Sequence, residues 1–280
     1  MNKPRLDVVC AWIVVCVTAW PLALSAGVSG ESELRPTGSR TGGQATAVFE
    51  PEARGPDDPD FLFQRPRVSL GIRSGIFLHR GDSELHEFTT DRFTLSSSDF
   101  IGMALGVEGG IWLDSRLELT FGVDGSRLTR RSSDREWVDY DDGSEIRQTT
   151  RVRHGPSASF GLRWYVRDRG ERLSTFAWVP SRWNVFVGGG GGITGYRFEQ
   201  WGDFVDEVDE IIFNDRFASE GSAFFPYLSG GAELRLTPRA AVVVEGRYQW
   251  GRDHLSSDFG DFDPLDLAGA RLTAGLSYRF

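Results

Sequence analysis

The C-terminal segment alternates apolar and polar residues up to its final position, and this alternation restricts the possible fold more than any other feature. In the stretch RLTAGLSYRF, Leu272, Leu276, Tyr278 and Phe280 share one side of an extended strand, and polar or small residues occupy the other. Strand side chains alternate with a period of two, so one whole side of this segment is apolar. Such a strand needs an apolar environment on one side and a polar environment on the other.

Seven other segments repeat this alternation: RVSLGIRSGIFL, FIGMALGVEGGIWL, RLELTFGVDG, RVRHGPSASFGLRWYV, WNVFVGGGGGITGYRF, FFPYLSGGAELRL and AVVVEGRYQW. Their length of about 10 to 16 residues suits tilted strands that cross a bilayer, which need roughly 9 to 11 residues each. Long connections follow the first, third, fifth and seventh segments. Residues 114–116 and 237–239 form short turns, and only the link at 167–182 departs from this pattern. Long loops at one end and short turns at the other are typical of outer-membrane barrels.

Closure of the sheet follows from the lack of water in hydrocarbon, where an unpaired strand edge has no hydrogen-bonding partner. The sequence therefore predicts an all-β fold, a closed antiparallel up-and-down transmembrane β-barrel of eight strands over residues 67–280. The odd or even position of a residue in a strand (its parity) assigns it to one of two sides, but parity alone does not say which side faces inward. A soluble eight-stranded barrel such as a lipocalin, with the apolar sides inside, is the alternative.

The ending LSYRF resembles the C-terminal signal of Gram-negative outer-membrane proteins, with Leu276, Tyr278 and Phe280 at its apolar positions. Together with VFVGGGGGITGYRF and YLSGGAELRLTPRAAVVVEGRYQW, it makes the chain similar to the small eight-stranded outer-membrane barrels that include OmpA, OmpX and OmpW. The resemblance implies recognition by the barrel-assembly machinery and contact with outer-membrane lipid and lipopolysaccharide. It implies location and assembly, and it does not specify a function.

The N-terminal region predicts export. Lys3 and Arg5 precede an apolar stretch at 8–24, and small residues follow at 25–27, as in a cleaved secretory signal peptide of residues 1–26. Residues 27–66 are rich in Pro, Gly and charged residues and predict a flexible periplasmic linker. Both cysteines, Cys10 and Cys16, lie within the signal peptide. The net charge of −9 argues against a nucleic-acid partner, and we expect a monomer.

Charged residues occupy the polar sides of these strands, where an eight-stranded barrel has a narrow interior. We expect interior ion pairs that plug the lumen, for example Glu118 or Asp124 with Arg151 or Arg153. The alternative is that these residues lie in water above or below the membrane. The candidates are Glu108, Glu118, Asp124, Arg151, Arg153, Glu233, Arg235, Glu245, Arg247 and Arg271.

The acidic stretch WGDFVDEVDEIIFND at 201–215 is predicted to be an outer loop, and its apolar residues suggest a binding surface or a lid. These residues are Trp201, Phe204, Ile211, Ile212 and Phe213. The spacing of its carboxylates does not match a calcium loop. No cofactor or metal is expected.

Candidate catalytic groups are few. His154 and Ser157 differ in parity and are expected on opposite sides of one strand. His254 has hydroxyl and carboxylate groups nearby in the sequence, which are also ordinary loop residues. We therefore expect a non-enzymatic barrel with a structural or surface-interaction role through its loops. The first alternative is a narrow OmpW-like channel for small or apolar solutes, and the second is a lipid-modifying outer-membrane enzyme.

Overall fold

Eight strands form a closed antiparallel barrel in the computed structural model, which describes residues 60–280 except 141, 207–210, 256 and 261. The predicted signal peptide and residues 27–59 of the predicted linker lie outside this part of the chain. The strands are β1 (Val68–His79), β2 (Ile101–Trp112), β3 (Leu117–Val138), β4 (Glu145–Tyr165), β7 (Trp183–Asp206), β8 (Ile211–Arg235), β9 (Ala240–Gln249) and β12 (Gly269–Arg279).

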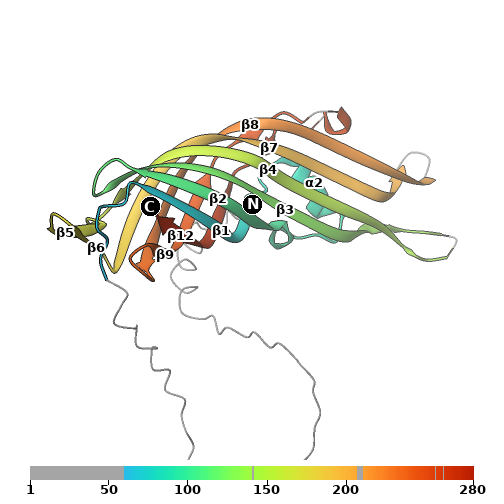
Figure 1. Ribbon diagram of the computed structural model, residues 1–280. Helices are drawn as coiled ribbons and strands as arrows, with labels where there is room; N and C mark the ends of the chain where they lie inside the picture. The colour runs from blue at the N-terminus through green and yellow to red at the C-terminus, as the bar shows by residue number, and fades with distance from the viewer. Residues whose placement is uncertain (1–59, 141, 207–210, 256, 261) are drawn as a thin grey trace, which may run out of the picture. The chain divides into compact units, whose positions relative to one another are not determined.

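Each barrel strand pairs with its neighbours in the chain, and β12 closes the ring against β1 from Ser69↔Arg279 to His79↔Gly269. The order is that of an up-and-down barrel, which confirms the predicted topology (Figure 1). The last residue takes part in this closure, since the Phe280 amide donates to the Val68 carbonyl over 2.9 Å.

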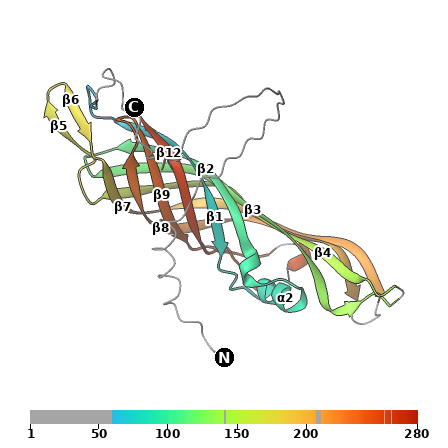
Figure 2. The same cartoon turned by 90° about the horizontal axis from the view of Figure 1, so that it is seen from below.

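The two ends of the barrel differ in their connections, and we call them the turn end and the loop end. The turn end carries the short links between β2 and β3 and between β8 and β9. It also carries the hairpin of β5 (Gly170–Ser174) and β6 (Ala177–Pro180), which accounts for the longer link predicted at 167–182. The loop end carries the connections after β1, β3, β7 and β9. Helix α2 (Glu84–Arg92) lies at this end, away from β5 and β6 (Figures 1 and 2).

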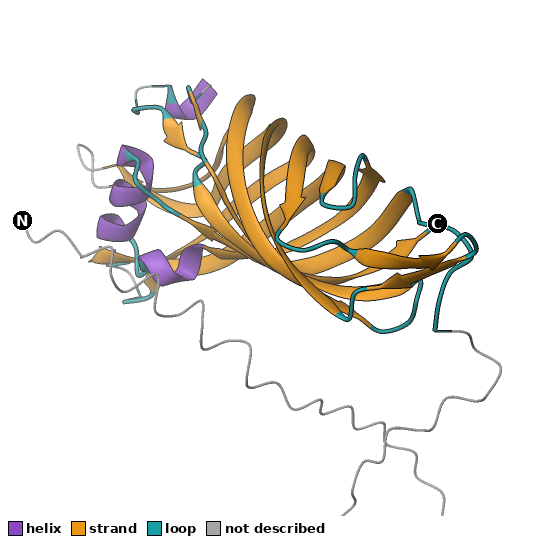
Figure 3. Ribbon diagram, turned by 90° about the vertical axis from the view of Figure 1, so that its left-hand side faces the viewer, coloured by secondary structure: helices purple, strands orange, loops and turns teal. Residues whose placement is uncertain are grey.

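Four neighbouring strands are about twice as long as the others. β3, β4, β7 and β8 have 22, 21, 24 and 25 residues, whereas β1, β2, β9 and β12 have 10 to 12. The extra length projects past α2 as a continuation of the sheet (Figures 1 and 2), and the helices gather at this one end of the barrel (Figure 3). The prediction of a loop at 201–215 was therefore wrong: Trp201 and Phe204 lie on β7, and residues 211–213 lie on β8.

Cross-strand pairing explains why the chain stays extended there. Phe204 is opposite Phe213, with ring centroids 6.0 Å apart, and Val205 is opposite Ile212. Aromatic and β-branched pairs of this kind stabilise a two-stranded ladder. The acidic residues of this segment suggested a loop when composition alone was considered. They sit between apolar residues, however, and those apolar residues favour a strand.

A bulge in β4 reverses the side on which its residues point. The register of β4 shifts between His154 and Ser157, and Gly155 has a φ of +105°. Such a φ favours glycine, and the extra residue changes the parity of the strand. Residues after the bulge follow the predicted pattern, but His154 faces inward and Arg153 faces outward. The predicted interior positions of Arg151 and Arg153 were wrong for this reason, as was the placement of His154 and Ser157 on opposite sides.

The outer wall near the turn end is apolar on every strand, and the side chains between these positions point inward. Its exposed apolar residues include Leu70, Ile72, Met103, Leu105, Phe121, Val123, Phe160, Leu162, Val185, Val187, Ile193, Phe224, Leu228, Val244 and Leu276. We call this surface the apolar band. No helix within the described ranges is long and apolar enough to cross a membrane.

The barrel domain extends a few residues into the predicted linker. Leu62 and Trp178 exchange two backbone hydrogen bonds of 2.8 Å, which fasten residues before β1 to β6. The loop end also contains two 3₁₀ helices, η1 (Ser97–Phe100) and η2 (Ser257–Phe259). A short strand pair, β10 (Arg252–Asp253) with β11 (Leu265–Asp266), completes it.

Candidate functional site

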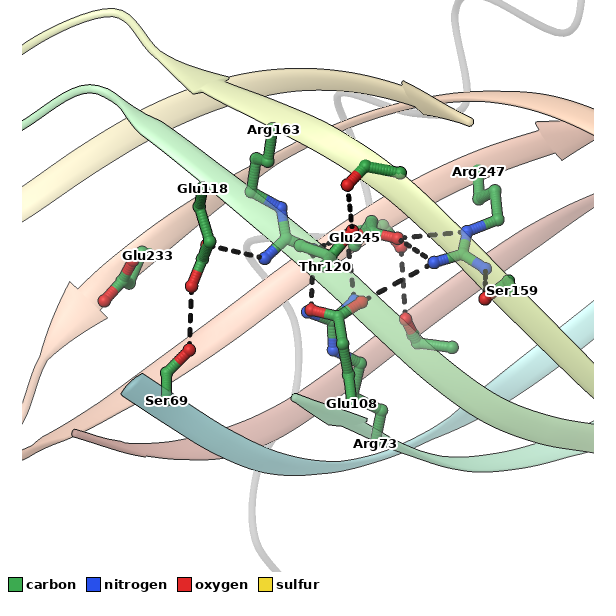
Figure 4. A network of polar contacts seen from close by, with 12 residues as sticks. Ser69, Arg73, Glu108, Glu118, Thr120, Ser159, Arg163, Glu233, Glu245 and Arg247 are labelled. Carbon is green, nitrogen blue, oxygen red and sulfur yellow. Dashed lines mark hydrogen bonds and ion pairs between the residues drawn. The ribbon is translucent and has the colours of Figure 1, made fainter. Parts of the chain in front are cut away.

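The interior of the barrel next to the apolar band is filled by charged side chains (Figure 4). Five carboxylates meet six guanidinium groups there, so one positive charge is left over. The carboxylates belong to Glu108, Glu118, Asp124, Glu233 and Glu245, and the guanidinium groups to Arg73, Arg163, Arg169, Arg247, Arg271 and Arg279. Burying an ion costs several kcal/mol unless it is paired, and here every ion has a partner.

Glu245 on β9 is the centre of this network. Its carboxylate is 2.6 Å from Arg163, 2.8 Å from Arg73 and 3.1 Å from Arg247, and its side chain is only 2% exposed. Arg163 and Arg73 also contact Glu108 on β2, the strand next to β1. One carboxylate thus joins residues from β1, β4 and β9, and the opposite walls are held together by charge.

The turn end of the lumen is closed by Arg169, which follows β4 and enters the barrel from the connection to β5. Its guanidinium group is 3.2 Å from both Glu118 and Glu233. It also stacks on Trp112, 3.5 Å from the ring centroid. Glu118 accepts further hydrogen bonds from Ser69 at 2.7 Å and from Tyr165 at 2.8 Å. These contacts satisfy a buried carboxylate from several directions, as buried polar groups require.

Glycines on β7 make room for large side chains on the neighbouring strands. A Cβ on Gly190 would lie 2.9 Å from the Tyr227 hydroxyl, and one on Gly192 would lie 2.7 Å from the Phe225 ring. Both rings point inward and are almost fully buried. Arg247 then packs over Tyr227 at 4.2 Å from the ring centroid. The glycine run therefore serves packing, consistent with its position in a strand.

At the loop end the filling changes from charged to apolar. The segments after β1 and β9 fold back into the barrel mouth and pack on the inner faces of β3, β4, β7 and β8. The resulting loop-end core comprises Leu85, Phe93, Leu95, Phe100, Leu128, Val152, Tyr196, Phe198, Ala223, Leu255, Phe259, Leu265 and Leu267. Phe198 is fully buried, and its ring centroid is 5.4 Å from that of Phe259.

Two histidines connect the charged and apolar sections. His79 Nε2 and His154 Nδ1 are 2.8 Å apart, and His79 Nδ1 is 2.8 Å from the Phe100 carbonyl. Nearby on α2, His86 Nδ1 lies 2.7 Å from the Ser83 hydroxyl. Burial lowers the pKa of His86 to about 4, with a smaller contribution from His79. His86 is therefore neutral at physiological pH.

The structure places most of the predicted lumen residues together, with partners that differ from those expected. Glu118 pairs with Arg163 and Arg169, and Asp124 pairs with Arg247 and Arg271. The expected partners are elsewhere: Arg153 is exposed on the outer wall, and Arg151 is 3.4 Å from Glu199 there.

Two more arginines, one predicted and one missed, lie at the turn end. Arg235 is half-buried near the end of β8. The prediction missed Arg169, which strand parity cannot identify because it lies in a connection. The charge balance gave no signal for it either, because the predicted lumen residues already included five arginines for five carboxylates.

The predicted catalytic candidates do not assemble a triad among the described residues. His254 is exposed, and the Asp258 carboxylate accepts from the Ala218 amide at 2.9 Å. His154 and Ser157 both face inward, where Ser157 bonds the Thr194 hydroxyl at 2.7 Å. No group of three metal-ligating side chains occurs in the parts of the chain that the structure describes.

Comparison with known proteins finds similarity to solved structures at low sequence identity. No family model and no curated protein matches the sequence. Among solved structures, it is similar to the outer membrane protein OprG of Pseudomonas aeruginosa, with 10% identity over 78% of this chain and 99% of that one and a TM-score of 0.41. It is also similar to a major outer membrane protein of Thermus thermophilus, with 12% identity, 78% and 100% coverage and a TM-score of 0.41.

Neisserial surface protein A is a third similar structure, with 11% identity over 79% of this chain and 98% of that one and a TM-score of 0.39. Identities this low carry over no activity, ligand or residue role.

Proposed function

We propose that this protein is an outer-membrane barrel of a Gram-negative bacterium whose lumen is closed and which acts through its surface at the loop end. The apolar band supports the membrane location, because exposed side chains such as Met103 and Leu105 form a continuous ring that water would not favour. A lipocalin-like barrel would place these residues inside and the charged residues outside, which is the reverse of the observed arrangement.

The observation that carries the proposal is the filling of the interior along its length. Ion pairs occupy the section within the apolar band, and the loop-end core occupies the mouth. A cavity beside β2, lined by Arg73, Glu108 and Glu245 among others, has a volume of about 30 Å³, which is room for one or two waters. A solute would have to displace both fillings in order to pass.

The C-terminal strand is the proposed contact for the barrel-assembly machinery. Leu276, Tyr278 and Phe280 project outward from β12, and the rings of Tyr278 and Phe280 are 4.9 Å apart at the turn end. Aromatic rings favour the boundary of a bilayer. In this orientation the turn end is periplasmic, the loop end is extracellular, and the protein is a monomer in outer-membrane lipid.

Two measurements on the chain folded in detergent test this proposal. An unheated sample should migrate faster than a boiled one on SDS gels, as a closed detergent-resistant barrel does. In planar bilayers the same sample should show no steady conductance. A stable conductance would overturn the closed lumen in favour of a narrow OmpW-like channel. Solubility without detergent, together with no shift on the gel, would overturn the membrane location.

A further inference from the structure

The outer wall carries a row of arginines just beyond the apolar band. Cross-strand register aligns Arg127 on β3 with Arg153 on β4, and Arg153 with Arg197 on β7. The β4 bulge is responsible for this row, because it turns Arg153 from the interior to the exterior. Arg151 lies two residues further out on β4, and Arg216 lies on β8 four residues beyond the position opposite Arg197; both pair with Glu199 on the same face. We call these five residues the arginine patch.

Positive charge predominates in this patch. Directly opposite like charges on paired strands destabilise a sheet, yet three arginines stand in line here. Two carboxylates offset part of this charge: Glu199, whose side chain is 3% exposed, pairs with Arg151 at 3.4 Å, Arg197 at 3.0 Å and also Arg216. Glu220, opposite Arg197 on β8, is 3.5 Å from Arg197, so five arginines meet two glutamates. Within the described residues, no ion pair joins Arg127 or Arg153 to a carboxylate. The net charge of the whole chain is −9, so this local excess of cations is not an effect of composition.

The height of the row on the wall fits the headgroup region of a bilayer. The outermost apolar row is Val123, Ala158, Ile193 and Phe224, aligned by register. Arg197 follows Ile193 by four residues, which is about 13 Å along a strand and about 10 Å along the normal of a tilted barrel. Long arginine side chains can reach back toward the bilayer surface from this height.

A hollow on the same wall adds groups that suit a sugar. It has a volume of about 450 Å³ and is lined by Arg151, Trp201, Asn214, Asp215 and Arg216. Trp201 lies 4.5 Å from the Arg151 guanidinium, measured to the ring centroid, and 5.9 Å from that of Arg216. Guanidinium groups bind phosphate in a bidentate manner, and amide and carboxylate groups bind hydroxyls.

We propose that the arginine patch and the adjoining hollow bind the phosphorylated sugar headgroup of a glycolipid in the outer leaflet, with the acyl chains of that lipid on the apolar band below. The inference rests on the proposed outer-membrane location. It assigns Arg127, Arg153 and Arg197 to the phosphates and the hollow around Trp201 to the sugars. The ligand class follows from the order of these groups on the wall: an apolar surface, then a row of cations, then an aromatic ring with hydroxyl-binding groups, since Trp201 is four residues beyond Arg197 on β7.

The test measures binding of bisphosphorylated lipid A to the full chain folded in detergent micelles, by native mass spectrometry or by thermal stabilisation. The triple variant Arg127→Gln, Arg153→Gln, Arg197→Gln should bind at least tenfold more weakly than the unmodified chain. A control variant, Arg172→Gln, Arg182→Gln, Arg252→Gln, loses the same charge at exposed positions elsewhere and should bind normally. Dephosphorylated lipid A should bind more weakly to the unmodified chain, and high salt should weaken binding of the phosphorylated form.

Several results would overturn the assignment. Equal binding by both triple variants would show that the row does not hold the lipid. Complete displacement of lipid A by millimolar inorganic phosphate would indicate a site for free phosphate. Absence of lipid A binding, in a sample that migrates as a folded barrel and does not conduct, would remove this inference and leave the proposed function intact. Failure to form a detergent-resistant barrel would remove both.

Discussion

The two halves of the barrel interior are both closed, but by opposite chemistry. Next to the apolar band, carboxylates and guanidinium groups such as Glu245 and Arg163 fill the space between the walls. At the loop end, a core built around Phe198 fills it with apolar side chains. The difference follows from the surroundings. Where the outer wall is apolar, the alternation of strand residues leaves the polar side inside, and where the wall faces water, the same alternation places apolar residues inside.

This comparison predicts that the two fillings fail in different ways. Ion pairs across the lumen connect strands that are far apart in the chain, so their loss should loosen the whole barrel. The loop-end core holds connecting segments against long strands that stay paired without it, so its loss should act locally.

The largest effect is expected from Glu245→Gln, which leaves Arg73, Arg163 and Arg247 without their shared charge. Removing one partner from a buried ionic network costs about 3–5 kcal/mol. The temperature at which the fast gel band converts to the slow one should therefore fall markedly. Glu171→Gln, at an exposed position on β5, is the matched control and should convert at the original temperature. Equal conversion temperatures would mean that hydrated charges, rather than paired ones, fill the lumen.

A somewhat smaller and local effect is expected from Phe198→Ala, which creates a cavity in the loop-end core. Truncating a fully buried phenylalanine costs about 3 kcal/mol or more. Amide hydrogen exchange should accelerate in the segments after β1 and β9, while the gel shift persists. Phe176→Ala removes an exposed ring and should leave exchange unchanged. Loss of the gel shift in Phe198→Ala would mean that the two halves unfold together.

Acidification should also affect the loop end, because burial holds the pKa of His86 at about 4, below its ordinary value of 6.5. The unfolded segment binds a proton that the folded segment excludes, so the stabilisation is complete above pH 6.5 and declines as the pH falls toward 4. Between pH 7.5 and pH 5.5 the expected loss from this group is about 1.4 kcal/mol.

Hydrogen exchange of the α2 segment at the two pH values measures this effect, after correction for the intrinsic pH dependence of exchange. The change with pH should shrink in His86→Gln and persist in His254→Gln, where the replaced ring is exposed. An undiminished change in His86→Gln would assign the response to other groups.

Sequence reasoning predicted the closed barrel because period-two alternation is strictly local and repeats on all eight strands. It could not place Arg151 or Arg153, since a single extra residue at Gly155 reverses parity for the rest of the strand. The partner choices within the lumen also escaped prediction. Those choices depend on the stagger of the strands and on Arg169, which reaches Glu118 from a connection.

The long strands were missed for a related physical reason. Apolar alternation weakens beyond the band, because outward residues such as Arg153 and Arg197 are charged there and the outward pattern is no longer apolar. The continuing signal is on the inward side, in Tyr196 and Phe198, which belong to the loop-end core. Where the surroundings of a strand change along its length, the strand can be followed in the sequence only by the alternation of its inward-facing residues.

The smallest effect is expected where an ion pair of the same type lies in water instead of the lumen. Arg116 Nε is 2.9 Å from Asp168 at the turn end, and hydrogen bonds from Arg116 and Ser115 hold the pKa of Asp168 below its ordinary value. Both side chains are about half exposed, so solvent screens the pair. Asp168→Asn should therefore leave the conversion temperature of the gel band unchanged within error at neutral pH, whereas Glu245→Gln lowers it. A fall in Asp168→Asn comparable to that in Glu245→Gln would show that the location of an ion pair, inside or outside the lumen, does not determine its contribution to barrel stability.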